Sequence, residues 1–187
     1  MDPVLQLAAA NRQRAQAIVG ELQIEEIWRS VGAEPRLVGS LRMGLLVRHR
    51  DIDYHIYSPQ LRLSESFAAM ARLAENPRIR RIEFANLLDA PDRCLEWHAW
   101  YERQLWQIDM IHMQAGSPWD GWFERMADRI TAALTDETRT AILRLKYDTP
   151  DERKIPGIAY YMAVLRDGVR TWPQLEEWLA AHPLDGI

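Results

Sequence analysis

The segment GSLRMGLLVRHRDID, residues 39–53, is the strongest indication of how this chain folds. The apolar residues before it predict a short strand that ends in a Gly39-Ser40 turn. A second strand follows and has Asp51 and Asp53 two positions apart, so strand alternation puts both carboxylates on one face. Two adjacent like charges are unfavourable without a cation between them, and a divalent metal with a bound polyphosphate would supply one.

A third carboxylate, Asp109, lies within an otherwise apolar predicted strand, residues 105–113. A lone carboxylate there costs roughly several kcal/mol unless it is paired or binds a metal. If this strand neighbours the strand of Asp51 and Asp53, three carboxylates converge. Such hard oxygen ligands suit Mg²⁺ or Mn²⁺ better than zinc.

Ion pairs are the alternative explanation for these acids. Asp51 and Asp53 could form a solvated strand face with arginine partners such as Arg48 and Arg50. Asp109 could instead pair with His98 or Arg103. In that case the three acids have a structural role and no metal is implied.

The rest of the chain predicts an α+β fold, with a mixed sheet of about five strands flanked by helices and a C-terminal helical region. Further strands are expected over 36–38, 79–86 and 95–101, and the hairpin between 95–101 and 105–113 turns near residues 102–104. Helices are expected over 3–31, 64–73, 117–134, 136–147, 158–166 and 171–180. We expect an α+β domain over 1–115 and a helical region over 116–187, joined near Gly116.

Composition excludes several classes of protein. The 187 residues have 48% hydrophobic content and a net charge of −4 with interspersed signs, which argues against a nucleic-acid-binding face. A single cysteine, Cys94, allows no internal disulfide and no cysteine-based zinc site. We find no apolar run of membrane-spanning length and no secretory pattern, so we expect a cytoplasmic protein.

The spacing of Gly39-Ser40, ten further residues, Asp51-Ile52-Asp53 and a later strand Asp109 resembles the nucleotidyltransferase signature of the DNA polymerase beta superfamily. The run from His49 to Asp53 is similar to small antibiotic-modifying and minimal nucleotidyltransferases. The resemblance covers roughly residues 30–113 and includes the order of strands and helices.

The resemblance implies a site and an activity. Gly39 and Ser40 would hold the triphosphate, with Arg42 and Lys146 as further phosphate contacts. Asp51, Asp53 and Asp109 would bind two Mg²⁺ or Mn²⁺ ions and be the catalytic residues. The implied reaction moves a nucleoside monophosphate from a nucleoside triphosphate, such as ATP, to a hydroxyl of a small molecule or protein.

A non-catalytic role is the alternative implied function. The residues after Ser40 depart from the pattern of the minimal enzymes, because Arg42 and Gly44 follow at altered spacing. The chain could then be a nucleotide-binding or partner-binding module, such as one component of a toxin–antitoxin pair. A homodimer or a small protein partner would suit either function, whereas nucleic acid and membranes are not expected partners.

Overall fold

Five strands form one mixed sheet in the computed structural model of the chain, which describes residues 2–102 and 106–183. The strand order is β1-β2-β5-β4-β3, and only the β2–β5 pair is parallel. The strands are β1 (Glu34–Val38), β2 (Asp51–Ser58), β3 (Ile79–Leu87), β4 (Cys94–Tyr101) and β5 (Trp106–Gln114). The predicted α+β class is confirmed, and β2 and β5 are neighbours, as convergence of the acids requires.

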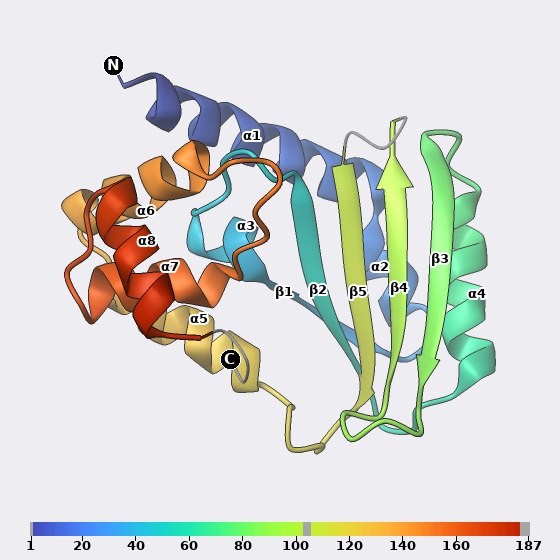
Figure 1. Cartoon of the computed structure of the whole chain (residues 1–187). Coiled ribbons are helices and arrows are strands. Elements are labelled where there is room, and N and C mark those ends of the chain that lie inside the picture. The colour runs from blue at the N-terminus through green and yellow to red at the C-terminus, as the bar shows by residue number, and fades with distance from the viewer. Residues whose placement is uncertain (1, 103–105, 184–187) are drawn as a thin grey trace.

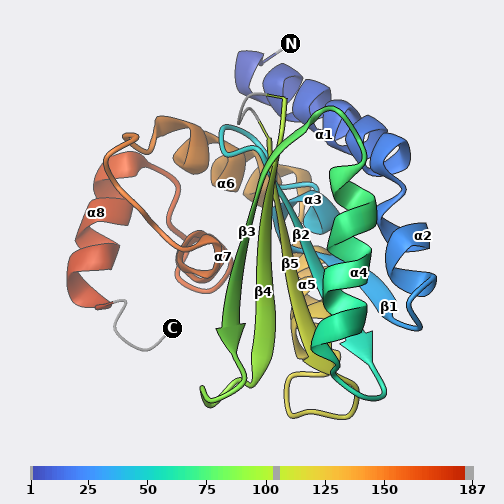
Figure 2. The same cartoon turned by 90° about the vertical axis from the view of Figure 1, so that its right-hand side faces the viewer.

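One face of the sheet is covered by helices. The inward side chains of β2, among them Ile52 and Tyr54, are almost fully buried with Ile108 of β5. They pack against the helices α1 (Pro3–Leu22), α2 (Ile24–Arg29) and α4 (Leu63–Ala74). Figure 2 shows these three helices on one side of the sheet, with α7 and α8 on the other. Burial of this apolar face fixes the register of β2, so Asp51 and Asp53 must point to the opposite face.

The N-terminal helix differs from the prediction of one helix over 3–31. It begins as expected, with the Asp2 side chain accepting a hydrogen bond from the amide of Val4. Gln23 then adopts a left-handed conformation with φ of 52°, which ends α1 and starts α2. The change in direction lets α2 bury Ile27 and Trp28 in the core.

The C-terminal helices form a second core beside the β1–β2 edge (Figure 1). These helices are α5 (Trp122–Ala133), α6 (Asp136–Asp148), α7 (Gly157–Leu165) and α8 (Trp172–Ala181). Met43 of the short helix α3 (Gly39–Met43) and the following Leu45 pack into this second core. The division near Gly116 stays a prediction, because residues on both sides of it share this core.

Two predicted helix starts are wrong. The helix expected from Ser117 begins at Trp122, because Gly121 turns the chain with φ of 68° just before α5. Helix α4 begins one residue before the expected cap, Ser64, and Arg62 is its N-cap. The predicted hairpin turn and Arg103 fall largely on residues 103–105, which lie outside the described residues. Among the helices described, none is long and apolar enough to cross a membrane.

Candidate active site

Three carboxylates meet on the face of the sheet opposite α1, α2 and α4. Asp51 and Asp53 lie on β2, and Asp109 lies on β5 directly opposite Asp53 in the parallel register. Gln107 is opposite Asp51. The predicted convergence follows from strand alternation and from the adjacency of β2 and β5.

The turn after β1 lies against these acids. Gly39 has φ of 66°, and a Cβ at this position would collide with the carboxylate of Asp53. Glycine is therefore needed both for the left-handed backbone and for the close approach of the chain to Asp53. The Gly39-Ser40 turn is thus in direct contact with the acidic face, as a phosphate-holding turn would be.

Lys146 of α6 reaches the same turn from the C-terminal half. Its ammonium donates hydrogen bonds to Ser40 Oγ at 2.8 Å and to the carbonyl of Leu45 at 3.0 Å. The side chain is buried, and burial lowers the pKa of Lys146 to about 8, while the nearby charges of Asp51 and Asp53 oppose that shift. The structure therefore places a cation between the turn and the acids.

The acidic face is electrostatically unfavourable without a further cation. Burial raises the pKa of Asp53 to about 8, and the charges of Asp51 and Asp109 add to the rise, whereas Lys146 opposes it. Asp51 Oδ1 is buried and has no hydrogen-bond partner among the described residues. An orphaned carboxylate oxygen and repelling neighbours fit a divalent cation that prefers hard oxygen ligands.

Asp109 is held by its neighbours. His98 Nδ1 donates to Asp109 Oδ1 at 2.5 Å, and Gln107 Nε2 donates to the same oxygen at 2.8 Å. His98 is therefore the ion-pair partner considered for Asp109, and its Nε2 lies 3.8 Å from Glu96. Within the described residues, no three His, Cys, Asp or Glu side chains form a group ready to hold a metal. Asp109 has only its second oxygen free of these two bonds.

Two of the arginines considered for the site, Arg42 and Arg48, lie elsewhere. Arg42 donates to Asp128 at 2.7 Å and to the carbonyl of Leu37 at 3.2 Å, so the structure does not bring it to the acids. Arg48 pairs with Asp151 instead of Asp51 or Asp53.

One site residue was missed by sequence reasoning. The hydroxyl of Tyr161 lies 3.4 Å from Ser40 Oγ, and its ring centre is 5.9 Å from the Lys146 ammonium. Burial raises the pKa of Tyr161 to about 12, so it stays a neutral phenol beside the turn. A tyrosine on an apolar helix is usually a core residue, and no signal in the sequence distinguishes this one.

Solved structures of other proteins have a similar fold. A structure of the Cid1 poly(U) polymerase with MgGTP bound has a TM-score of 0.60 and 14% identity, covering 83% of this chain and 50% of its own. A cytoplasmic RNA terminal U-transferase has a TM-score of 0.57 and 14% identity, covering 83% and 47%. Neither a protein-family model nor a curated protein matches the sequence. The chain spans about half the length of these nucleotidyltransferases and is similar to them in fold.

Proposed function

We propose that this protein is a metal-dependent nucleotidyltransferase that moves a nucleoside monophosphate from a nucleoside triphosphate to a hydroxyl group. One observation supports this most strongly: the acids of β2 and β5 face a Gly-Ser turn that is bonded to a buried lysine. An acidic face alone has many uses. An acidic face in contact with the Gly39-Ser40 turn and with the ammonium of Lys146 suits a triphosphate with its metal.

The turn and Lys146 would bind the leaving pyrophosphate portion of the nucleotide. Gly39 lets the backbone approach closely, and Ser40 offers a hydroxyl and an amide to phosphate oxygens. Lys146 donates to Ser40 in this structure, and on nucleotide binding its ammonium would donate to a phosphate oxygen. Tyr161, held beside Ser40, limits the positions open to that hydroxyl.

Asp51, Asp53 and Asp109 would hold Mg²⁺ or Mn²⁺. When bound, the metal would neutralise the triphosphate and lower the pKa of the acceptor hydroxyl. Asp109 is also the candidate to accept the hydroxyl proton, through the oxygen that His98 and Gln107 leave free. His98 fixes the orientation of this carboxylate and would stabilise its position during proton transfer.

We further propose a small molecule or a protein as the acceptor. The net charge of −4 and the carboxylates on this face of the sheet are unfavourable for a polyanionic RNA acceptor. The similarity to a poly(U) polymerase makes RNA the necessary competitor in any test of the acceptor.

The direct test is metal-dependent nucleotide binding, followed by transfer. Each nucleoside triphosphate is titrated by calorimetry with Mg²⁺ or Mn²⁺ and again with a chelator. We expect binding that requires the metal and that Asp51→Asn with Asp53→Asn abolishes. Asp89→Asn with Asp148→Asn, two acids on exposed positions, is the matched control and should bind normally. Failure of all nucleotides to bind at millimolar concentration would falsify the proposal.

One observation favours a non-catalytic binding role. His98 and Gln107 both hydrogen-bond to Asp109 Oδ1, so this oxygen is already occupied and is not free to bind a metal. This role predicts nucleotide binding without transfer to any acceptor. A cellular phenotype that survives Asp51→Asn with Asp53→Asn would show that catalysis is not the function and would favour partner binding, because the double variant removes two proposed metal ligands and preserves side-chain shape.

A further inference from the structure

A pocket lies directly beside the carboxylates, on the same face of the sheet. Its volume is about 180 Å³, and its floor includes His55 of β2, Ile111 of β5 and Glu96 of β4. His55 and Ile111 each follow a site acid, Asp53 and Asp109, by two positions along a strand. At roughly 3.3 Å per residue, the floor therefore begins about 7 Å from the acids. A molecule seated there would reach Asp109 only if it extended along the strands by this distance.

Aromatic side chains form the wall of this pocket. Trp119 and Phe123 come from the segment that leads from β5 into α5, and both line the pocket. The rings of His55 and Phe123 meet edge-to-face, with centroids 4.6 Å apart. Apolar side chains such as Met113 complete the lining. The pocket therefore offers ring faces and methyl groups to a ligand, as sites for small organic molecules do.

The charged side chains that line the pocket are acidic. Glu96 and Asp92 are its two carboxylates, and no Lys or Arg is among the described residues that line it. The nearest basic group to Glu96 among its described contacts is His98, whose Nε2 lies 3.8 Å from the Glu96 carboxylate. The same ring donates from Nδ1 to Asp109, so His98 is shared between the two acids.

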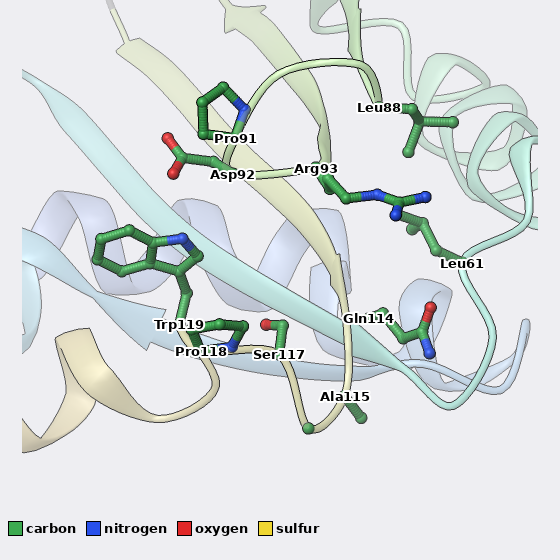
Figure 3. A pocket seen from close by; sticks show the side chains of 11 residues that line it. Leu61, Leu88, Pro91, Asp92, Arg93, Gln114, Ala115, Ser117, Pro118 and Trp119 are labelled. Carbon is green, nitrogen blue, oxygen red and sulfur yellow. The ribbon is translucent and has the colours of Figure 1, made fainter.

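Arg93 turns away from this pocket. Asp92 and Trp119 also line a neighbouring hollow of about 330 Å³, shown in Figure 3. There the side chain of Arg93 extends toward Leu61 and Gln114, while the carboxylate of Asp92 points to the opposite side, where Trp119 lies. Arg93 is thus directed away from Asp92, and the acidic, aromatic character of the first pocket is retained.

We infer that this pocket is the acceptor site, and that it binds a small hydroxyl-bearing organic cation with an apolar or aromatic face. The inference rests on the proposed function and deepens it by naming the acceptor class. Glu96 would bind the cationic group, Trp119 and Phe123 would contact the ring or alkyl body, and the hydroxyl would point toward Asp109. An anionic acceptor, including an RNA end with its phosphates, is disfavoured by the same carboxylates.

The test uses tyramine and 4-hydroxyphenylacetate, which share a phenol and differ in the sign of their charge. The full chain is labelled at the methionine methyl groups, and the Met113 signal reports occupancy of the pocket without nucleotide or metal. We expect tyramine to shift this signal and to bind about tenfold more tightly than 4-hydroxyphenylacetate. Glu96→Gln should remove most of that preference.

Two further variants test whether the preference for tyramine comes from Glu96 and not from other carboxylates. Glu83→Gln changes a carboxylate on β3, which pairs with Arg81 and does not line the pocket, and it should leave the preference intact. Asp51→Asn with Asp53→Asn should also retain it, which excludes tyramine binding at the acids themselves. Three results would overturn the inference. The first is a Met113 signal that tyramine leaves unshifted, and the second is equal affinity for the two phenols. The third is a preference for tyramine that is lost in Asp51→Asn with Asp53→Asn but kept in Glu96→Gln. Loss of nucleotide binding would leave this result unaffected, because the titration contains no nucleotide.

Discussion

The ammonium of Lys146 donates a 2.8 Å hydrogen bond to Ser40 Oγ, and the two residues are 106 positions apart in the chain. The bond joins the turn after β1 to helix α6, so the C-terminal helices complete the site that the strands begin. The lysine is buried beside two carboxylates and a phenol. A buried ammonium bonded to the Gly39-Ser40 turn and close to two carboxylates supports the proposed role of Lys146 as a phosphate contact.

Replacement of Lys146 should cost stability and nucleotide affinity together. Lys146→Met removes the cation nearest to Asp51 and Asp53 and leaves Ser40 and the Leu45 carbonyl without their donor. We expect a loss of about 1–3 kcal/mol in the free energy of unfolding, measured by urea titration at neutral pH. The loss should be smaller in an Asp53→Asn background, where less negative charge is left uncompensated.

The chain provides a matched control for this prediction, because Lys154 is its only other lysine. Lys154 is exposed in the loop between α6 and α7. Lys154→Met should change stability by less than about 0.5 kcal/mol and leave nucleotide affinity unchanged. Equal effects of the two substitutions would show that Lys146 acts only through the net charge.

Gly39 should tolerate no side chain. In Gly39→Ala the Cβ collides with the Asp53 carboxylate and the residue must also keep its positive φ. We expect a destabilisation of about 2–4 kcal/mol in urea and loss of metal-dependent nucleotide binding. Gly168→Ala separates the two causes, since Gly168 has φ of 72° and open space around it. It should lose only about 1 kcal/mol and bind nucleotide normally.

Removal of one acid should stabilise the metal-free protein. The pKa of Asp53 is about 8 in the folded chain and 3.8 as its ordinary value, so ionisation of this group opposes folding as pH rises between them. Asp53→Asn keeps the shape and removes the charge. We expect about 1–3 kcal/mol of added stability in urea at neutral pH with a chelator present. Unchanged or reduced stability would mean that Asp53 is already compensated.

The sheet and the acids could be predicted from sequence because both depend on local patterns. Alternation along β2 put Asp51 and Asp53 on one face, and the apolar run around Asp109 identified its strand. The kink at Gln23 could not be predicted, because glutamine has no special preference for the left-handed conformation that it adopts. The start of α5 was wrong because Ser117 carries a capping signal that the turn to Gly121 overrides.

Contacts between distant segments were beyond sequence reasoning. Lys146 was expected near the phosphates only through the family resemblance, since no pattern around it specifies Ser40 as a partner. Tyr161 gave no indication, because its burial in the helical core and its approach to Ser40 require the packed structure. His98 could be considered for Asp109 but not selected until the β4–β5 register placed the two opposite each other.

The fold also predicts a pH dependence remote from the acids. His112 of β5 is fully buried, and burial lowers its pKa from 6.5 to about 4. Ser66 Oγ accepts a hydrogen bond from the indole of Trp97 and lies 3.0 Å from His112 Nδ1. The other ring nitrogen, Nε2, lies 2.8 Å from Ser58 Oγ. Each ring nitrogen therefore has a serine hydroxyl as its partner, and it is burial that disfavours a second ring proton.

Acid should therefore destabilise the protein through His112. A histidine whose pKa is lowered by folding takes up a proton more readily in the unfolded chain, so stability is full above pH 6.5 and declines as pH falls toward 4. We expect a decline of about 1–3 kcal/mol from this group in urea titrations across that range. His112→Gln, which retains a donor and an acceptor, should flatten the profile, whereas His49→Gln at an exposed position should not. An equally steep profile in His112→Gln would assign the acid sensitivity to other groups.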